Sequence, residues 1–208
     1  MTKPAPFDTH ANDYDAWFAT HSDLYQAELE AVRSFIPARG NGVEIGVGSG
    51  RFAAALAIRI GVEPAPRMAE LARQRGIEVL EGFAEALPFT DSSFDFAVMV
   101  TVVCFLDDVA QAFREAWRIL KPKGALVIGF IDRESELGQQ YNRIKEQSRF
   151  YHDATFHSVS ELETLLNKAG FSDLAYRQTL FPGEITGLDV MEGHGSGGFV
   201  VIQAHKST

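Results

Sequence analysis

The sequence predicts an α/β fold: a doubly wound, mostly parallel sheet with helices on both faces. The main observation is that short apolar strands alternate with helices from Gly42 onwards, which is typical of parallel strands joined by crossover helices. The segment 94–100 is almost entirely apolar, as expected of a strand buried on both faces of such a sheet. The length of 208 residues fits one domain, 1–208, in which we find no repeat or linker.

The composition excludes several classes of protein. The apolar fraction of 46% and the charged fraction of 23% are those of a globular chain. The formal net charge of −9 argues against nucleic acid as a partner, because phosphate backbones bind to basic surfaces. The single cysteine, Cys104, excludes an intramolecular disulfide, and no His or Cys spacing indicates a metal site. Because no long apolar run and no signal-peptide core is present, we expect a cytoplasmic protein with no membrane partner.

Residues 1–36 predict helices that precede the sheet. Apolar and aromatic side chains recur there at spacings of three and four, as on one helical face. The first stripe consists of Tyr14, Trp17, Phe18 and His21, and a second one covers 24–36. We expect this segment to act as a helical lid over the sheet.

Residues 42–131 predict the main part of the sheet. Strands are expected over 43–45, 58–62, 77–80, 94–100 and 125–131. Helices are expected from Arg51 to about Ala57, from Pro66 to Gly76, and over 109–120. The last of these has apolar residues at i, i+4, i+7, i+8 and i+11, with Asp107 or Asp108 as its N-cap.

The remaining chain is expected to complete the sheet. Residues 132–157 show no clean periodicity and are interpreted as a lid or substrate insertion. Over 158–208 we expect a helix, with Ser160 and Glu163 as its capping box, and closing strands at about 173–181 and 198–204.

A glycine-rich turn and an acidic residue indicate a nucleoside ligand. The sequence Gly46-Val47-Gly48-Ser49-Gly50 follows the first strand, where glycine permits backbone to approach a ligand closely. Glu63 ends the next strand, and a carboxylate there can accept hydrogen bonds from both hydroxyls of a ribose. A dinucleotide site would have glycine at position 51. Arg51 stands there instead, so a nicotinamide cofactor is disfavoured.

Five ordered segments resemble the class I S-adenosylmethionine-dependent methyltransferases. They are Glu44-Ile45-Gly46-Val47-Gly48-Ser49-Gly50, Gly61-Val62-Glu63-Pro64, Gly82-Phe83-Ala84-Glu85-Ala86-Leu87-Pro88-Phe89, Ser93-Phe94-Asp95, and Arg118-Ile119-Leu120-Lys121-Pro122-Lys123-Gly124. The pattern is similar to the methyltransferase type 11 branch, which includes ubiquinone-biosynthesis-like enzymes. The resemblance implies a Rossmann-like, seven-stranded sheet, with 42–131 as the cofactor-binding core and S-adenosyl-L-methionine as the cofactor, converted to S-adenosyl-L-homocysteine.

The resemblance also implies which residues hold the cofactor. Gly46, Val47 and Gly48 would pass beside its methionine part, and Glu44 would support its ammonium. Glu63 would hold the ribose. The adenine would lie near Pro64, Met68, Ala84 and Glu85, and the methionine end near Thr101 and Val102.

The sequence departs from this family at the strand end beyond Val100. Thr101 to Leu106 contain no histidine, where many relatives carry one, so no general base and no catalytic residue is identified. This favours either an acceptor that is intrinsically nucleophilic, such as an amine, a thiol, an arsenical or an enolate-like carbon, or a base supplied from outside the core. The candidate substrate residues are aromatic or basic side chains of the lid segments and the strand end: Tyr14, Trp17, His21, Phe105, Tyr141 and Tyr151.

The function we predict is methyl transfer to a small-molecule acceptor by in-line displacement. A non-catalytic module that only binds S-adenosylmethionine is an alternative, and a nicotinamide-dependent oxidoreductase is a weaker one. The sequence identifies neither the acceptor, nor whether N, O, S or C is methylated, nor the oligomeric state.

Overall fold

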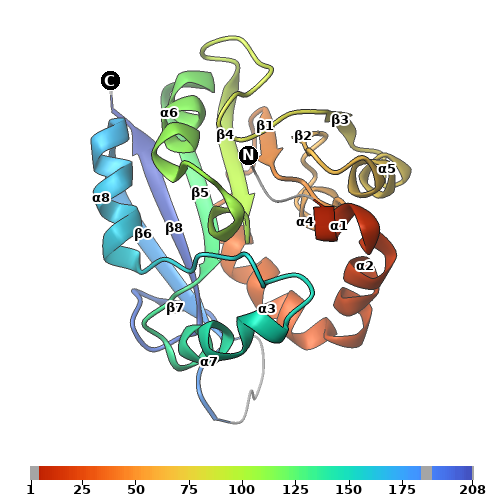
Figure 1. Cartoon of the computed structure of the whole chain (residues 1–208). Coiled ribbons are helices and arrows are strands. Elements are labelled where there is room, and N and C mark those ends of the chain that lie inside the picture. The colour runs from red at the N-terminus through yellow and green to blue at the C-terminus, as the bar shows by residue number, and fades with distance from the viewer. Residues whose placement is uncertain (1–4, 184–188, 208) are drawn as a thin grey trace.

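The computed structural model describes residues 5–183 and 189–207, which form one mixed sheet with helices on both faces (Figure 1). The strand order is β3-β2-β1-β4-β5-β8-β6-β7, parallel from β3 to β5 and antiparallel from there to β7. The strands are β1 Gly42–Ile45, β2 Ile60–Val62, β3 Glu78–Leu80, β4 Phe94–Val100, β5 Leu120–Ile131, β6 Phe171–Thr179, β7 Met191–Glu192 and β8 Phe199–Lys206. The α-helices are α1 Ala5–Thr9, α2 Ala11–Thr20, α3 Ser22–Arg33, α4 Arg51–Ala55, α5 Pro66–Gln74, α6 Val109–Ile119, α7 Glu136–Ile144 and α8 Val159–Ala169. Short 3-10 helices are η1 Val103–Phe105 and η2 Lys145–Gln147.

The predicted fold class is confirmed, with one difference in the number of strands. The sheet has eight strands, whereas the family resemblance implied seven. The extra strand, β7, has two residues and pairs with β6 through Arg177 and Gln178. Two exposed residues cannot show an alternating pattern, so the sequence held no signal for it.

Successive residues of the central strands pack on opposite faces of the sheet. In β4, Ala97 and Met99 belong to the core beneath α6 and α8, whereas Phe96, Val98 and Val100 belong to the core beneath α3 and α4. All five side chains are buried. Burial on both faces explains why this strand is a continuous apolar run in the sequence.

Helix boundaries follow local capping, and one predicted cap is wrong. The side chain of Asp108 accepts a hydrogen bond from the Gln111 amide at 2.9 Å and caps α6, one of the two predicted positions. The capping box of α8 is formed by Ser158 and Glu161, not by Ser160 and Glu163. The same spacing occurs at both pairs, but Val159 is buried and must already face the core, so the helix begins there.

The segment 132–157 contains a helix that the sequence analysis did not predict. Ser135 caps α7 by accepting a hydrogen bond from the Gly138 amide at 3.0 Å. Leu137, Tyr141 and Ile144 stand at i, i+4 and i+7 of this helix, and the first two pack against the core beneath α3 and α4, whereas Ile144 is 48% exposed. Figure 1 shows α7 with α1, α2 and α3 around the edge at which the parallel strands end. These four helices are called the cap below.

Candidate functional site

The glycine turn after β1 adopts a conformation that only glycine tolerates well. Gly46 and Gly48 have positive φ angles of 71° and 53°. A Cβ on Gly46 would lie 2.6 Å from a methyl group of Val102. The amides of Gly46 and Val47 both donate to the Val62 carbonyl, at 2.8 and 3.0 Å, which fixes the turn against β2. Glycine here leaves exposed backbone that a ligand can approach.

Glu63 ties the end of β2 to this turn. Its Oε2 accepts a hydrogen bond from the Gly48 amide at 2.8 Å, and its Oε1 accepts one from the Ala65 amide at 3.0 Å. The residue is 7% exposed, and burial raises the pKa of its carboxyl to about 7. Each carboxylate oxygen retains a further lone pair that can accept from a ligand hydroxyl.

A cavity extends from the glycine turn and Glu63 to the end of β4. Its space, including the open mouth, is about 660 Å³. The lining residues come from α1, α2, the β1 turn, the β2 end, α5, the loop after β3, and the β4 end: Phe7, Tyr14, Gly46, Gly48, Glu63, Pro64, Met68, Gly82, Phe83, Ala84, Val100, Thr101, Val102, Phe105 and Leu106. Most of the cofactor residues expected from the sequence are therefore brought together here. We call this space the turn cavity.

Three of the expected cofactor residues do not line the turn cavity. Glu44 is 2% exposed, and its Oε2 has no hydrogen bond within the described residues. Burial raises the pKa of the Glu44 carboxyl well above its usual range. The Val47 side chain packs against Gly61, where a Cβ would lie only 2.6 Å from it. The Glu85 carboxylate is directed to the start of α6, because it accepts a hydrogen bond from the Asp107 amide at 3.1 Å.

Several lining residues were not singled out by the sequence analysis. Phe7 of α1 contacts Tyr14 and Phe105, with ring centroids 5.2 and 4.8 Å apart. Gly82 and Phe83 belong to one of the five quoted segments, although no role was assigned to them. Phe7 lies in a five-residue helix that is too short to show periodicity, so nothing in the sequence identified it.

Tyr14 closes the turn cavity from the side of α2. Its hydroxyl lies close to the side chain of Thr101, the residue after β4, whose Oγ1 donates to the Val100 carbonyl at 2.8 Å. Thr101 itself has a positive φ of 53°, an uncommon conformation for a branched residue and one that occurs at functional sites. Burial raises the pKa of the Tyr14 hydroxyl above its usual value, so this group stays protonated at neutral pH.

A charged cluster holds α2 against the body of the domain. Asp15 accepts hydrogen bonds from Arg51 at 2.7 and 2.9 Å and from Arg75 at 2.8 Å. Although partial burial acts in the opposite direction, these hydrogen bonds lower the pKa of Asp15 to about 2. Arg51, which replaces the third glycine of a dinucleotide motif, therefore binds a helix of the cap.

The expected substrate residues are distributed over neighbouring spaces. Tyr14 and Phe105 line the turn cavity, and Tyr151 lines a small space that shares Thr101 with it. Trp17 and Tyr141 line a further cavity beneath the cap. His21 is exposed and stacks on the Trp17 ring, with centroids 4.5 Å apart, and it lines none of these three spaces.

The described residues form neither a metal-binding group nor a membrane-spanning helix. Within residues 5–183 and 189–207, no group of three or more His, Cys, Asp or Glu is arranged to hold a metal ion. In the same part of the chain, no helix combines the length and the apolar character needed to cross a membrane.

Comparisons with known proteins agree with this geometry. The model of a family described as methyltransferase domain matches residues 43–128. A crystal structure of an S-adenosylmethionine-dependent methyltransferase from Thermotoga maritima, described as a possible histamine N-methyltransferase, is 51% identical, with a TM-score of 0.95 over 99% of this chain and 100% of that one. An uncharacterised protein of Methanocaldococcus jannaschii is 43% identical over 96% of this chain and 98% of its own length. A demethylmenaquinone methyltransferase of Roseiflexus castenholzii is 28% identical over 68% of this chain and 71% of its own length. The chain belongs to the S-adenosylmethionine-dependent methyltransferases, whose methyl donor is S-adenosylmethionine.

Proposed function

We propose that this methyltransferase methylates a small molecule that reaches the end of the turn cavity near Tyr14 and Thr101. The observation that carries this proposal is the continuity of that cavity. It connects the glycine turn and Glu63, at one end, with the aromatic side chains of the cap, at the other. Tyr14 and Phe105 cover this end, so the acceptor must be small enough to fit beneath the cap.

The residues of the turn cavity fit the methyl donor. We assign the ribose hydroxyls to Glu63, because its buried carboxylate has free lone pairs and no cation beside it among the described residues. Gly46 and Gly48 leave room for the methionine part, since a side chain on either would narrow the approach.

The apolar part of the cavity suits the adenine and the sulfur end. Pro64, Met68 and Ala84 would contact the adenine, and Thr101 and Val102 would lie beside the sulfur end. Glu44 does not line the cavity, and its role as a support for the donor's ammonium follows the resemblance alone. The assignments of the adenine and of the sulfur end follow the resemblance and agree with which residues line the cavity.

The protein contributes position rather than acid or base chemistry. When bound, S-adenosylmethionine supplies a methyl group whose bond to sulfur breaks, with both electrons going to sulfur, as the acceptor's lone pair forms the new bond. The cap holds the acceptor in line and excludes water, an effect of up to about 7–11 kcal/mol in favourable cases. Tyr14 stays protonated and does not act as a base, and we take the acceptor atom to carry a free lone pair already.

An amine nitrogen is the acceptor atom that we favour. A neutral amine attacks without prior removal of a proton and loses its proton to solvent after the transfer. The Thermotoga maritima relative, which is described as a possible histamine N-methyltransferase, supports the same choice.

The test begins with binding of S-adenosylhomocysteine, measured by titration calorimetry. We expect Glu63→Ala to weaken binding by about 1–3 kcal/mol, the usual range for lost hydrogen bonds to a charged group. Labelled S-adenosylmethionine is then incubated with pools of small amines, alcohols and thiols, and methylated products are identified by mass spectrometry. Transfer to amines supports the proposal. Binding without transfer to any pool would instead identify a non-catalytic module, and absence of binding would contradict the site.

A further inference from the structure

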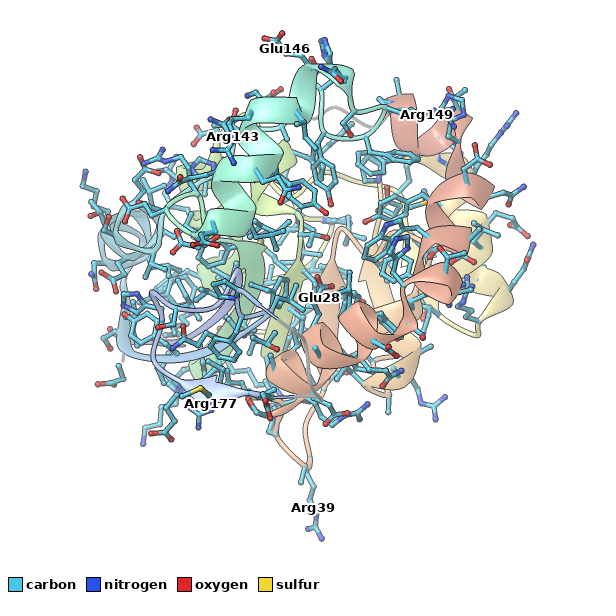
Figure 2. All side chains as sticks on the ribbon, turned by 90° about the horizontal axis from the view of Figure 1, so that it is seen from below. Glu28, Arg39, Arg143, Glu146, Arg149 and Arg177 are labelled. Atoms are coloured by element: carbon cyan, nitrogen blue, oxygen red, sulfur yellow. The ribbon has the colours of Figure 1, made fainter. Side chains whose placement is uncertain are left out.

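A buried carboxylate on α3 faces a second cavity beneath the cap. Glu28 is 7% exposed and lines a space of about 740 Å³, including its open mouth. Figure 2 shows Glu28 near the centre of the view from below, whereas Arg39 points away from the body at the tip of its loop. The aromatic and apolar lining of this space includes Trp17, Leu24, Ile131, Leu137, Tyr141 and Phe181. We call it the Glu28 cavity.

Nothing in the described chain neutralises Glu28. Within residues 5–183 and 189–207, the Glu28 carboxylate makes no hydrogen bond and no ion pair. No lysine, arginine or histidine is among the described residues that line its cavity. The other carboxylate there, Glu136, is exposed to solvent. Burial without compensation raises the pKa of the Glu28 carboxyl to about 8.

A buried acid without a partner destabilises the folded protein. Removing a carboxylate from water costs several kcal/mol unless donors or a counter-charge replace the solvent. An apolar residue would suit this face of α3 better, because Leu24 and Val32 lie one turn before and after Glu28 on the same apolar stripe. A carboxylate at this position is therefore explained by a function that requires its charge, which a leucine does not have.

The Glu28 cavity adjoins the turn cavity through a row of aromatic rings. Tyr141, which lines the Glu28 cavity, contacts Tyr151 with ring centroids 5.1 Å apart. Tyr151 stacks on Phe105 at 5.7 Å, and Phe105 lines the turn cavity. On the other side, Trp17 lies one turn beyond Tyr14 on α2. The two cavities share no lining residue, so these rings form the wall between them, and an acceptor anchored at Glu28 has to extend past this wall to reach the turn cavity.

We propose that Glu28 binds a positively charged group of the methyl acceptor, which is a small organic cation with a separate nucleophilic atom. This inference rests on the proposed function and specifies its substrate class. A carboxylate combined with the faces of Trp17 and Tyr141 is a suitable site for an ammonium, because aromatic rings attract cations and the carboxylate supplies the counter-charge. When its positively charged group is bound to Glu28, the acceptor is oriented. The lone pair of its nucleophilic atom is then directed towards the turn cavity.

Proton release provides a signature of this site. The titratable groups that face Glu28 are Tyr14 of α2, Tyr141 and Glu136 of α7, and Tyr151 after η2. Burial raises the pKa of all three tyrosines, so they stay neutral between pH 6 and 9. Glu28 itself is mostly protonated at pH 7 because its pKa is about 8. A bound cation requires the ionised form, so binding at pH 7 should release close to one proton.

The experiment compares charged and uncharged probes by titration calorimetry. The probes are benzylammonium, 2-phenylethylammonium and 3-phenylpropylammonium, each with the alcohol of the same length. Titrations at pH 7 in two buffers of different ionisation enthalpy count the protons released. Glu28→Gln removes the charge and keeps the shape, and Glu136→Gln is the matched control on the exposed side of the same cavity.

We expect the wild-type protein to prefer at least one ammonium over its alcohol by about tenfold or more, with proton release. Glu28→Gln should remove both the preference and the proton release, and Glu136→Gln should retain both. Equal binding of ammonium and alcohol, or a preference that survives Glu28→Gln, would overturn the proposal. S-adenosylhomocysteine is titrated into the same samples. If S-adenosylhomocysteine binds but no ammonium is preferred over its alcohol, only the inference about Glu28 is refuted. If S-adenosylhomocysteine does not bind, the cofactor site is refuted, and the ammonium and alcohol affinities alone decide the inference about Glu28.

Discussion

Binding of the cofactor should depend on pH through Glu63. In the ligand-free protein, burial raises the pKa of this carboxyl to about 7. Ribose hydroxyls donate to the ionised form, so binding lowers this pKa and is favoured where the group is already ionised. Between pH 8 and pH 6 the ionised fraction falls from about nine-tenths to about one-tenth. We therefore expect the affinity for S-adenosylhomocysteine to fall about tenfold over this interval, or about 1.4 kcal/mol.

The assay is titration calorimetry at pH 6, 7 and 8 on three proteins. Glu63→Gln cannot ionise, so its affinity should be lower than that of the wild type at pH 8 and independent of pH. Glu28→Gln is the control, because Glu28 also titrates near this interval but lies outside the turn cavity. It should retain the full pH dependence. A wild-type affinity that is constant from pH 6 to 8, or a pH dependence that persists in Glu63→Gln, would refute the assignment.

Three further predictions concern the stability of the fold. Asp15→Asn should lower the free energy of unfolding in urea by about 1–2 kcal/mol at pH 7, because two arginines lose their carboxylate. Since the folded-state pKa of Asp15 is lowered to about 2, this difference should vanish as the pH falls from about 4 to 2, and an unchanged difference at pH 2 would contradict the reasoning. Gly46→Ala should abolish calorimetric binding of S-adenosylhomocysteine, whereas Gly76→Ala, with a similar φ of 83° but no atom within 4 Å of the new Cβ, should cost only about 1–2 kcal/mol of stability and retain binding. Glu28→Gln should raise the melting temperature at pH 9, where the wild-type carboxylate is ionised, and the gain should shrink as the pH falls below about 8; equal gains at pH 5 and 9 would exclude a buried ionisable group.

The part of the site built on backbone geometry was predictable from the sequence. Gly46 and Gly48 stand where positive φ angles and a close approach are required, and few other residues satisfy both demands. Glu63 ends a short strand, so its position at the carboxyl edge of the sheet follows once the strand is identified. Local backbone constraints of this kind determine the residue type at single positions, so they can be identified from the sequence.

The parts that depend on tertiary packing were not predictable in the same way. Helix α7 was missed although Leu137, Tyr141 and Ile144 recur at helical spacing, because this stripe is only two turns long and stands in a segment that is otherwise polar. The choice between two capping boxes depended on the burial of Val159, which no spacing reveals. Phe7 reaches the turn cavity only because α1 folds back over it.

The helical periodicity of the sequence does contain a signal for Glu28. It occupies a position on the apolar stripe of α3, between Leu24 and Val32, where an ordinary surface helix would place another apolar residue. A charged residue at such a position indicates either a buried partner or a ligand. Only the structure shows that no partner is present in the described chain and that a cavity lies in front of the carboxylate.

In the complex proposed above, two of the buried acids, Glu63 and Glu28, divide the recognition of cofactor and acceptor between them. Burial raises the pKa of both, but Glu63 receives two backbone amides, whereas Glu28 receives none from the described residues. A carboxylate that already has donors suits the neutral hydroxyls of a ribose, and one without donors requires a full positive charge. Tyr14 lies between them, and the negative charge of each carboxylate adds to the burial that raises the pKa of its hydroxyl. Tyr14 therefore stays protonated when both acids are ionised, and its hydroxyl does not take a proton from the acceptor. An acceptor anchored by one cationic group, with a second atom that carries a free lone pair, is the chemistry that this arrangement of charges favours.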